Sequence, residues 1–235
     1  MNPREANAIV LLSGGLDSAT VLYIARDRGL KPFTVSFDYG QRHRVELEMA
    51  AALSREAKCP AHIALRLDSN LFRGTALVGS DVPVPQAREI DDSIPVTYVP
   101  ARNILFLSHA LALAESYKIE SIFIGVNALD YSGYPDCRPE FLDAFEKMAA
   151  IGMKTGQDGR PIKIEAPLVT MSKADIIREG TRLGVDYGRT SSCYDPDPNG
   201  KPCGKCDSCQ LRAKGFAEAG LDDPLVGKFG PGAGA

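Results

Sequence analysis

The stretch "IVLLSGGLDSATVLYIA", residues 9–25, places a glycine pair between two apolar segments that differ in periodicity. Residues 9–12 form a short, uncharged run rich in β-branched side chains, which is typical of a strand buried on both faces. From Ser18 onward the apolar residues follow a helical spacing, and Gly29 stands where that helix should end. The stretch therefore predicts a strand, a tight turn over residues 13–17, and a helix.

The turn itself predicts a phosphate-binding site. Glycines let the backbone approach a ligand and present its N–H groups, and the start of the following helix adds the positive end of a dipole. The turn is not of the Walker type, because no Gly-Lys-Ser/Thr follows it. An ordinary strand-to-helix turn is the alternative, and the flanking Ser13, Asp17 and Ser18 count against it.

Composition narrows the class of protein. The chain has 235 residues, of which 44% are hydrophobic and 24% charged, as in ordinary soluble domains. That length suits one sizeable core with a small appendage. No apolar run approaches the roughly 20 residues needed to span a bilayer, and the first residues lack a signal-peptide pattern. We therefore expect a cytoplasmic location and no membrane partner. The formal net charge of −3 argues against general nucleic-acid binding.

Strands and helices alternate along the rest of the chain. Apolar runs predict further strands at 33–37, 63–67, 121–126 and 162–166, and helical spacing predicts helices at 44–58, 102–117, 139–151 and 173–183. Residues 68–97 contain several prolines and predict a long loop. The fold class is therefore α/β, a doubly wound, five-stranded and mainly parallel sheet. Its phosphate turn lies at the carboxyl end of the first strand, where such sheets bind ligands.

Four of the six cysteines gather near the C-terminus, and they are Cys193, Cys203, Cys206 and Cys209. The C-x2-C-x2-C spacing of the last three favours a tetrahedral zinc site over a disulfide cluster, with an iron–sulfur cluster as the rival. Four thiolates leave no open coordination position, so we expect a structural rather than a catalytic zinc that fastens residues 190–201 onto a final helix. The predicted organisation is an α/β domain over 1–185, a cysteine loop with a helical appendage over 186–222, and a flexible tail over 223–235.

Three polar loops follow predicted strands or open a predicted helix. They are "DYGQRH" at 38–43, "YVPARN" at 98–103 and "GVNALDYSGYPDCRPEF" at 125–141. Each alone is compatible with loop solvation and capping. Together with the phosphate turn at one edge of one sheet, they predict a ligand-binding site.

"SGGLDS" resembles the pyrophosphatase loop of the N-type ATP-pyrophosphatases, the PP-loop superfamily, whose fold is adenine nucleotide alpha hydrolase-like. With the three polar loops, "IEAPL" at 164–168, "SKADII" at 172–177 and the cysteine tail, residues 8–222 resemble the 7-cyano-7-deazaguanine synthase family of the queuosine pathway. The resemblance implies a carbon–nitrogen ligase that uses ATP with Mg²⁺, ammonia and 7-carboxy-7-deazaguanine. Adenylation of the carboxylate and then of the amide would release AMP and pyrophosphate. It also implies a homodimer.

The resemblance implies roles for the residues of the phosphate turn. The nucleotide would be bound by Leu12, Ser13, Gly14, Gly15, Leu16, Asp17 and Ser18. Asp17 would help to place Mg²⁺, and its alternative role is N-cap of the first helix. Lys173 and Arg102 are the further catalytic candidates, because they would neutralise charge on the phosphates. The alternative for Lys173 is a surface residue in the first turn of a helix.

Substrate binding is expected from the loops, through Tyr39, Gln41, Arg42, His43, Asn103, Asn127, Asp130, Tyr131, Tyr134, Asp136 and Arg138. Arg42 and Arg138 are candidates for the substrate carboxylate, which suits bidentate arginine. The tyrosines would pack on the deazaguanine ring, and Asp130 or Asp136 would accept protons from its guanine-like edge. His43 would handle a proton from ammonia, or be only a hydrogen-bonding member of its loop.

Two other functions stay open at this stage. One is a tRNA thiolase or lysidine synthase with the same phosphate loop, an idea that Cys137 supports because thiolases of this type need a reactive cysteine. The acidic balance of the chain argues against that alternative. The other is a non-enzymatic zinc module that binds nucleotides or protein partners, which predicts ATP binding without pyrophosphate release.

Overall fold

A parallel sheet forms the centre of the molecule. The computed structural model describes residues 2–42, 44–79, 81–87, 93–129 and 134–229. Its strands are β1 (Ala8–Leu11), β2 (Pro32–Asp38), β3 (Ala61–Arg66), β4 (Ser121–Phe123) and β5 (Lys163–Glu165). They lie in the order β3-β2-β1-β4-β5, and every pairing is parallel. The predicted doubly wound, five-stranded fold is confirmed.

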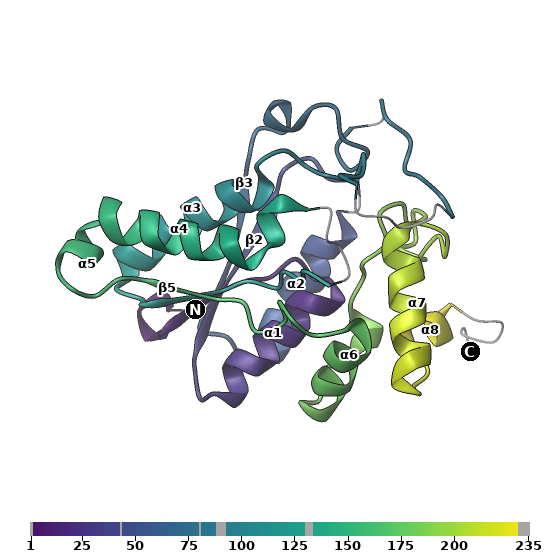
Figure 1. Ribbon diagram of the computed structural model, residues 1–235. Helices are drawn as coiled ribbons and strands as arrows, with labels where there is room; N and C mark the ends of the chain where they lie inside the picture. The colour runs from purple at the N-terminus through teal and green to yellow at the C-terminus, as the bar shows by residue number, and fades with distance from the viewer. Residues whose placement is uncertain (1, 43, 80, 88–92, 130–133, 230–235) are drawn as a thin grey trace.

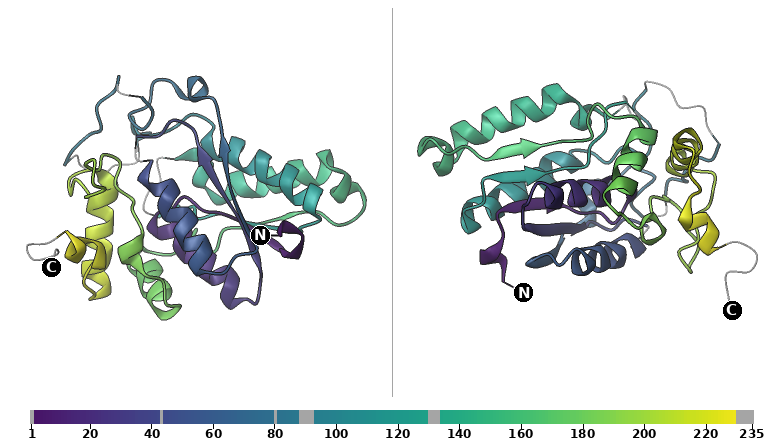
Figure 2. Two further views of the ribbon diagram at one scale, coloured as in Figure 1. Left: turned by 180° about the vertical axis from the view of Figure 1, so that it is seen from behind. Right: turned by 90° about the horizontal axis from the view of Figure 1, so that it is seen from below.

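Helices cover both faces of this sheet (Figures 1 and 2). They are α1 (Leu16–Asp27), α2 (Val45–Glu56), α3 (Arg102–Tyr117), α4 (Pro139–Gly152), the short α5 (Lys154–Gln157) and α6 (Lys173–Arg182). Side chains of β1 alternate between two cores. Ile9 packs with α3 and α4, and Val10 packs with α1, α2 and α6. This two-sided burial explains why the strand carries no charge.

The fourth strand is shorter than predicted. The apolar run suggested residues 121–126, but β4 ends at Phe123. Beyond it the chain passes against the start of α1, where a Cβ on Gly125 would lie 3.1 Å from the backbone nitrogen of Ser18. The apolar Ile124 and Val126 that follow the strand are buried in the core that contains α3 and α4, and the nitrogen of Ile124 still donates to the oxygen of Glu165 in β5.

The predicted long loop at 68–97 is partly packed into the core. It begins with a single 3-10 turn, η2 (Ser69–Phe72), and the side chains of Phe72 and Leu77 are buried against β2 and α3. Further 3-10 turns are η1 (Pro3–Glu5), η3 (Pro135–Cys137) and η4 (Tyr187–Arg189). In the described residues, no helix is long and apolar enough to cross a membrane.

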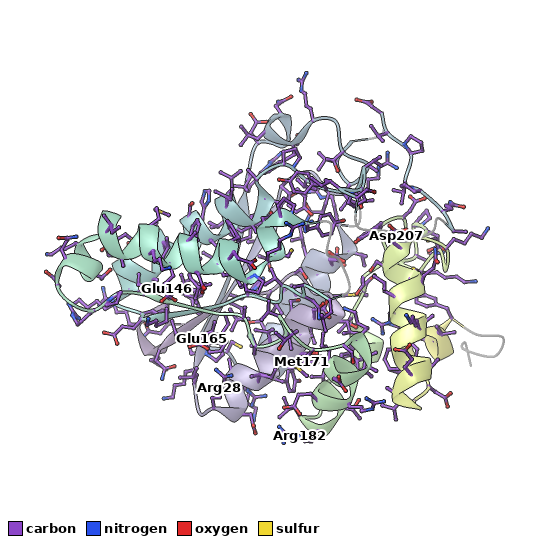
Figure 3. All side chains as sticks on the ribbon, viewed as in Figure 1. Arg28, Glu146, Glu165, Met171, Arg182 and Asp207 are labelled. Carbon is purple, nitrogen blue, oxygen red and sulfur yellow. The ribbon has the colours of Figure 1, made fainter. Side chains whose placement is uncertain are left out.

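A helical appendage lies beside α6 and contains α7 (Asp207–Ala219) and α8 (Pro224–Lys228) (Figure 1). Asp207, labelled in Figure 3, begins α7 directly after Cys206. The segment from residue 223 onward, which was predicted to be a flexible tail, begins instead with an ion pair and a short helix. Asp223 pairs with the buried Arg212 at 2.7 Å, and α8 follows it. The prediction of a flexible tail was wrong at these residues, because the sequence pattern does not reveal that Asp223 pairs with a buried arginine eleven residues earlier.

Candidate functional site

A cavity of about 260 Å³ opens at the carboxyl edge of the sheet, beside the turn between β1 and α1. Most of the predicted site residues line it, namely Leu12, Ser13, Gly15, Leu16, Asp17, Ser18, Tyr39, Gln41, Arg102, Asn103, Asn127, Tyr134 and Lys173. They come from five separate segments of the chain. The structure therefore brings the phosphate turn and the polar loops together at one place.

The glycine pair shapes the turn. Gly14 has a φ of +90°, and a Cβ there would lie 2.2 Å from the carbonyl oxygen of Glu46 in α2. Only glycine fits this conformation and this close approach. Gly15 is the N-cap residue of α1. Asp17 is therefore not the N-cap, and that alternative was wrong.

Hydroxyl oxygens of serine side chains accept hydrogen bonds from the backbone N–H groups of the turn. The backbone nitrogen of Ser13 donates to Ser18 Oγ at 3.1 Å, and that of Gly15 donates to Ser13 Oγ at 3.2 Å. The nitrogen of Leu16 donates to Ser192 Oγ at 3.3 Å, from the segment just before the cysteine loop. Phosphate oxygens would replace these hydroxyl acceptors, so the turn is already shaped around anion-binding donors.

Asp17 and Lys173 form an ion pair inside the cavity. Lys173 Nζ lies 2.8 and 2.9 Å from the two carboxylate oxygens of Asp17, and the lysine side chain is only 12% exposed. The surface alternative for Lys173 was therefore wrong. Helix α7 packs closely over this lysine, since a Cβ on Gly215 would lie 2.4 Å from Lys173 Cγ.

Arg102 opens α3 and faces the aromatic side of the cavity. Burial raises the pKa of the Tyr39 phenol overall, although the nearby guanidinium of Arg102 acts to lower it. Burial alone would lower the pKa of the Arg102 guanidinium, but the electrostatic effect of Tyr39, Tyr134 and Asp136 raises it. Asp136 Oδ2 accepts from the backbone nitrogen of Asn103 at 3.1 Å, which caps the start of α3. The arrangement fixes a permanent positive charge beside two tyrosines.

Gln41 and Asn127 line the cavity while they bind backbone groups. Gln41 accepts from the nitrogen of Tyr39 at 2.9 Å and donates to the oxygen of Phe37 at 2.9 Å. Asn127 donates to the oxygens of Leu168 and Met171. Both side chains therefore hold the loops that carry the other site residues.

The remaining predicted residues lie differently. The guanidinium of Arg42 donates to the backbone oxygens of Gly79 and Val82, away from the cavity lining. Asp136 and the exposed Arg138 are also not among the lining residues, and neither is Gly14. His43, Asp130 and Tyr131 lie outside the described residues. Distant backbone partners, which the sequence does not reveal, decide where Arg42 points.

Several polar lining residues escaped the sequence analysis, among them Glu46, Ser192, Tyr194 and Arg212. Glu46 belongs to a predicted helix and carried no signal of its own. Ser192 and Tyr194 flank Cys193, and Arg212 follows the last cysteine by three residues. Their closeness to the cysteines was the available signal, because a loop fastened beside a sheet edge contributes a wall to the site.

Cys137 lines the cavity as a buried thiol. Burial raises its pKa to about 12, and the neighbouring carboxylate of Asp136 acts in the same direction. A thiol with such a pKa is protonated near neutral pH, whereas nucleophilic cysteines are thiolates. The thiolase alternative therefore loses the reactive cysteine on which it rested.

The four C-terminal cysteines converge in the appendage. The sulfur atoms of Cys193, Cys203, Cys206 and Cys209 all lie within 4.8 Å of one another. Backbone nitrogens donate to three of these sulfurs, for example that of Cys203 to Cys193 Sγ at 3.2 Å. Hydrogen bonds with Cys193 and Cys209 lower the pKa of Cys206. Close sulfurs that accept N–H hydrogen bonds fit a metal ion such as zinc.

Comparison with known proteins supplies a family. A family model described as queuosine biosynthesis protein QueC matches residues 7–220. The chain is 56% identical over 221 residues to the 7-cyano-7-deazaguanine synthase of Kineococcus radiotolerans, covering 93% of this chain and 96% of that one. It is 57% identical over 220 residues to the enzyme so named from Syntrophotalea carbinolica, covering 93% and 95%. The similarity spans the phosphate turn, the polar loops and the cysteine cluster alike.

Proposed function

Because the chain belongs to the queuosine biosynthesis protein QueC family, we propose that it converts 7-carboxy-7-deazaguanine and ammonia into 7-cyano-7-deazaguanine at the expense of ATP. The observation that carries this proposal is the single cavity in which the glycine turn, the Asp17–Lys173 pair and the Arg102–tyrosine group meet. An ATP-dependent nitrile synthesis needs a triphosphate and a flat acid side by side, and this cavity offers donors for both.

The first half of the reaction activates the carboxylate. Its oxygen attacks the α-phosphorus of ATP, the bond to the β-phosphate breaks, and pyrophosphate leaves. The N–H groups of the turn would hold the departing phosphates, and Lys173 would neutralise charge that develops on them. Asp17 would help to place Mg²⁺, a hard cation that prefers oxygen ligands. The product is an acyl adenylate, whose leaving group is AMP.

The second half introduces nitrogen. Ammonia attacks the carbonyl carbon and expels AMP, which leaves a primary amide. A second ATP then adenylates the amide oxygen, and loss of AMP with the remaining nitrogen-bound protons gives the nitrile. Tyr39 and Tyr134 would hold the ring by stacking, and the neighbouring Arg102 would face the anionic groups.

The cysteine cluster would hold one structural Zn²⁺ per chain, bound by Cys193, Cys203, Cys206 and Cys209. A closed set of four thiolates supplies folding energy rather than Lewis-acid chemistry. The site would then shape one wall of the cavity, because Ser192 and Tyr194 flank the first ligand. A homodimer, a cytoplasmic location and the absence of nucleic-acid and membrane partners belong to the same proposal, and sedimentation tests the first of these.

One reaction tests the proposed function. The purified protein is incubated with 7-carboxy-7-deazaguanine, ammonium, Mg²⁺ and ATP, and the products are followed by mass spectrometry. We expect the nitrile together with AMP and pyrophosphate. AMP without nitrile would keep the adenylation but reject the substrate, and ADP or no nucleotide turnover would reject the proposal.

A further inference from the structure

A glutamate at the start of α2 reaches the same cavity. Glu46 stands in the first turn of that helix, yet it is only 9% exposed and lines the cavity beside the phosphate turn. Glu48, two residues later on the same helix, is exposed and does not line it. The two glutamates share the helix dipole, so the dipole does not explain why one of them is buried.

The buried carboxylate of Glu46 also interacts electrostatically with a neighbouring side chain of the cavity. It lies close enough to the phenol of Tyr39 to raise the pKa of that group, after the larger effect of burial. The nearby guanidinium of Arg102 acts in the opposite direction and lowers the pKa of the same phenol. Tyr39 therefore lies near both a cation and an anion, and Arg102 and Glu46 line the same cavity as the phenol.

Glu46 is also distinct from the other acid of the cavity. Among the described lining residues, the carboxylates are Asp17 and Glu46, and the cations are Arg102, Lys173 and Arg212. Both carboxylate oxygens of Asp17 accept hydrogen bonds from Lys173, in the part of the cavity beside the phosphate turn. Arg212 is held by Asp223, at 2.7 and 2.8 Å. Glu46 is thus the second described carboxylate of the cavity lining, and it acts on the phenol of Tyr39.

The proposed reaction requires a proton acceptor close to the entering nitrogen. At neutral pH ammonia is almost entirely ammonium, which has no lone pair for attack. The nitrogen enters with four protons and ends in the nitrile with none. Cys137 is a neutral thiol, and the arginines carry no acceptor. A buried carboxylate both attracts the ammonium cation and can remove its first proton.

We propose that Glu46 binds ammonium in the cavity and accepts its first proton. This step rests on the proposed function. An N–H bond of ammonium breaks, the proton moves to a carboxylate oxygen of Glu46, and the freed electron pair attacks the carbonyl carbon of the acyl adenylate. The bond from that carbon to the phosphate-bearing oxygen then breaks, so AMP leaves with its electron pair. The carboxylic acid returns its proton to solvent before the next turnover.

Glu46→Gln tests the step, because it keeps the shape of the side chain and removes its charge and basicity. Two measurements are made, the KM for total ammonium in nitrile formation and the ATP–pyrophosphate exchange that depends on 7-carboxy-7-deazaguanine without ammonium. We expect the exchange to persist and kcat/KM for ammonium to fall about 100-fold at pH 7. Free ammonia increases about tenfold per pH unit, so raising the pH should rescue the variant more than the parent enzyme.

Glu48→Gln is the matched control, since it removes the same charge from the same helix turn without touching the cavity. It should leave both measurements unchanged. Glu46→Asp keeps the acid but withdraws it by one methylene, so its kcat/KM for ammonium should fall between those of the parent and Glu46→Gln. Equal dependence of nitrile formation on ammonium in all variants would overturn the proposal. It would also be overturned if Glu46→Gln lost the ATP–pyrophosphate exchange while Glu46→Asp kept the ammonium dependence of the parent enzyme. Failure of the parent enzyme to form nitrile would instead reject the proposed function.

Discussion

The glycine turn after β1 and the cysteine loop before α7 both direct backbone N–H groups toward a ligand-binding centre, but different forces hold them. The turn is built on a buried strand, and Gly14 is wedged against the backbone of α2. The cysteine loop, between η4 and α7, has little regular structure, and its small core consists largely of the cysteines themselves. The turn is therefore fixed by packing, whereas we expect the order of the loop to depend on a metal bound by its sulfurs.

This difference separates two ways of building a site. A packed turn keeps its shape without ligand, so substitutions there act by steric conflict with neighbouring backbone. A loop whose small core consists largely of metal ligands would gain order from metal binding, which is also folding energy. The two meet at one seam, where Ser191 donates its backbone N–H to the oxygen of Gly14 at 3.1 Å. Four substitutions break or sharpen the comparison.

The largest effect is expected from Gly14→Ala. The added Cβ would strain a φ of +90° and overlap the oxygen of Glu46, so the turn must move. A displacement of about 1 Å costs about 100-fold in activity, which nitrile formation would measure. Gly29→Ala is the matched control, because its φ is +77° and open space surrounds it. If both variants lost equal activity, the packing of the turn would not be its decisive feature.

Removal of the metal ranks second. Cys206→Ser, or chelation, should disorder the cysteine loop and lower activity by about 10- to 100-fold, because the loop carries Ser192. Circular dichroism should show the α/β core intact, and hydrogen exchange should rise around residues 191–206. Cys59→Ala, outside the cluster, should keep one bound zinc per chain. Unchanged exchange in the metal-free protein would show that the loop is packed like the turn.

Gly215→Ala examines the contact between the appendage and the cavity. Its Cβ would lie 2.4 Å from Lys173 Cγ, a flexible side chain that can shift at modest cost. We expect folding to persist and activity to fall about tenfold, because Lys173 leaves its position by less than 1 Å. Gly152→Ala, with nothing near its added methyl group, is the control. A rise in the KM for ATP at least as large as the fall in kcat would contradict a transition-state role for Lys173.

The smallest effect is expected at Cys137. Because burial raises the pKa of this thiol to about 12, it should not react with iodoacetamide in the folded protein at pH 7.5. Reactivity should rise only at strongly alkaline pH, as the thiolate forms, and peptide mass spectrometry measures it. Cys137→Ala should change activity less than about threefold, since it removes van der Waals contacts and only long hydrogen bonds of the sulfur with Asn103 and Asp136. Rapid labelling at pH 7.5, or loss of activity in the variant, would restore the thiolase alternative.

Local patterns were enough to predict the strand and helix alternation. Helix α3 begins at Arg102 and ends at Tyr117, as its spacing indicated. The glycine turn and the four cysteines were also visible, because each feature is encoded within a few adjacent residues. Parallel topology then placed the loops at one edge, since the carboxyl ends of parallel strands meet there.

Partners distant in sequence could not be predicted. Arg42 looked like a ligand for an anion, but it binds carbonyl groups 37 and 40 residues away. Asp223 looked like the start of a tail, but it pairs with a buried arginine. Glu46 gave no signal, because its burial depends on how α2 meets the turn. A single sequence shows which polar groups exist, while packing decides which of them are already in use.

The ion pair between Asp17 and Lys173 has a thermodynamic consequence. The lysine already has an anionic partner in the protein, so a phosphate that takes the lysine leaves the aspartate without its cation. A divalent cation bound by Asp17 would neutralise the carboxylate again. In the loaded site the phosphate would then pair with Lys173 and the cation with Asp17. Nucleotide and cation would then bind with positive heterotropic coupling, and by reciprocity each would raise the affinity for the other by the same factor. The resting pair keeps these two side chains mutually neutralised until both ligands arrive.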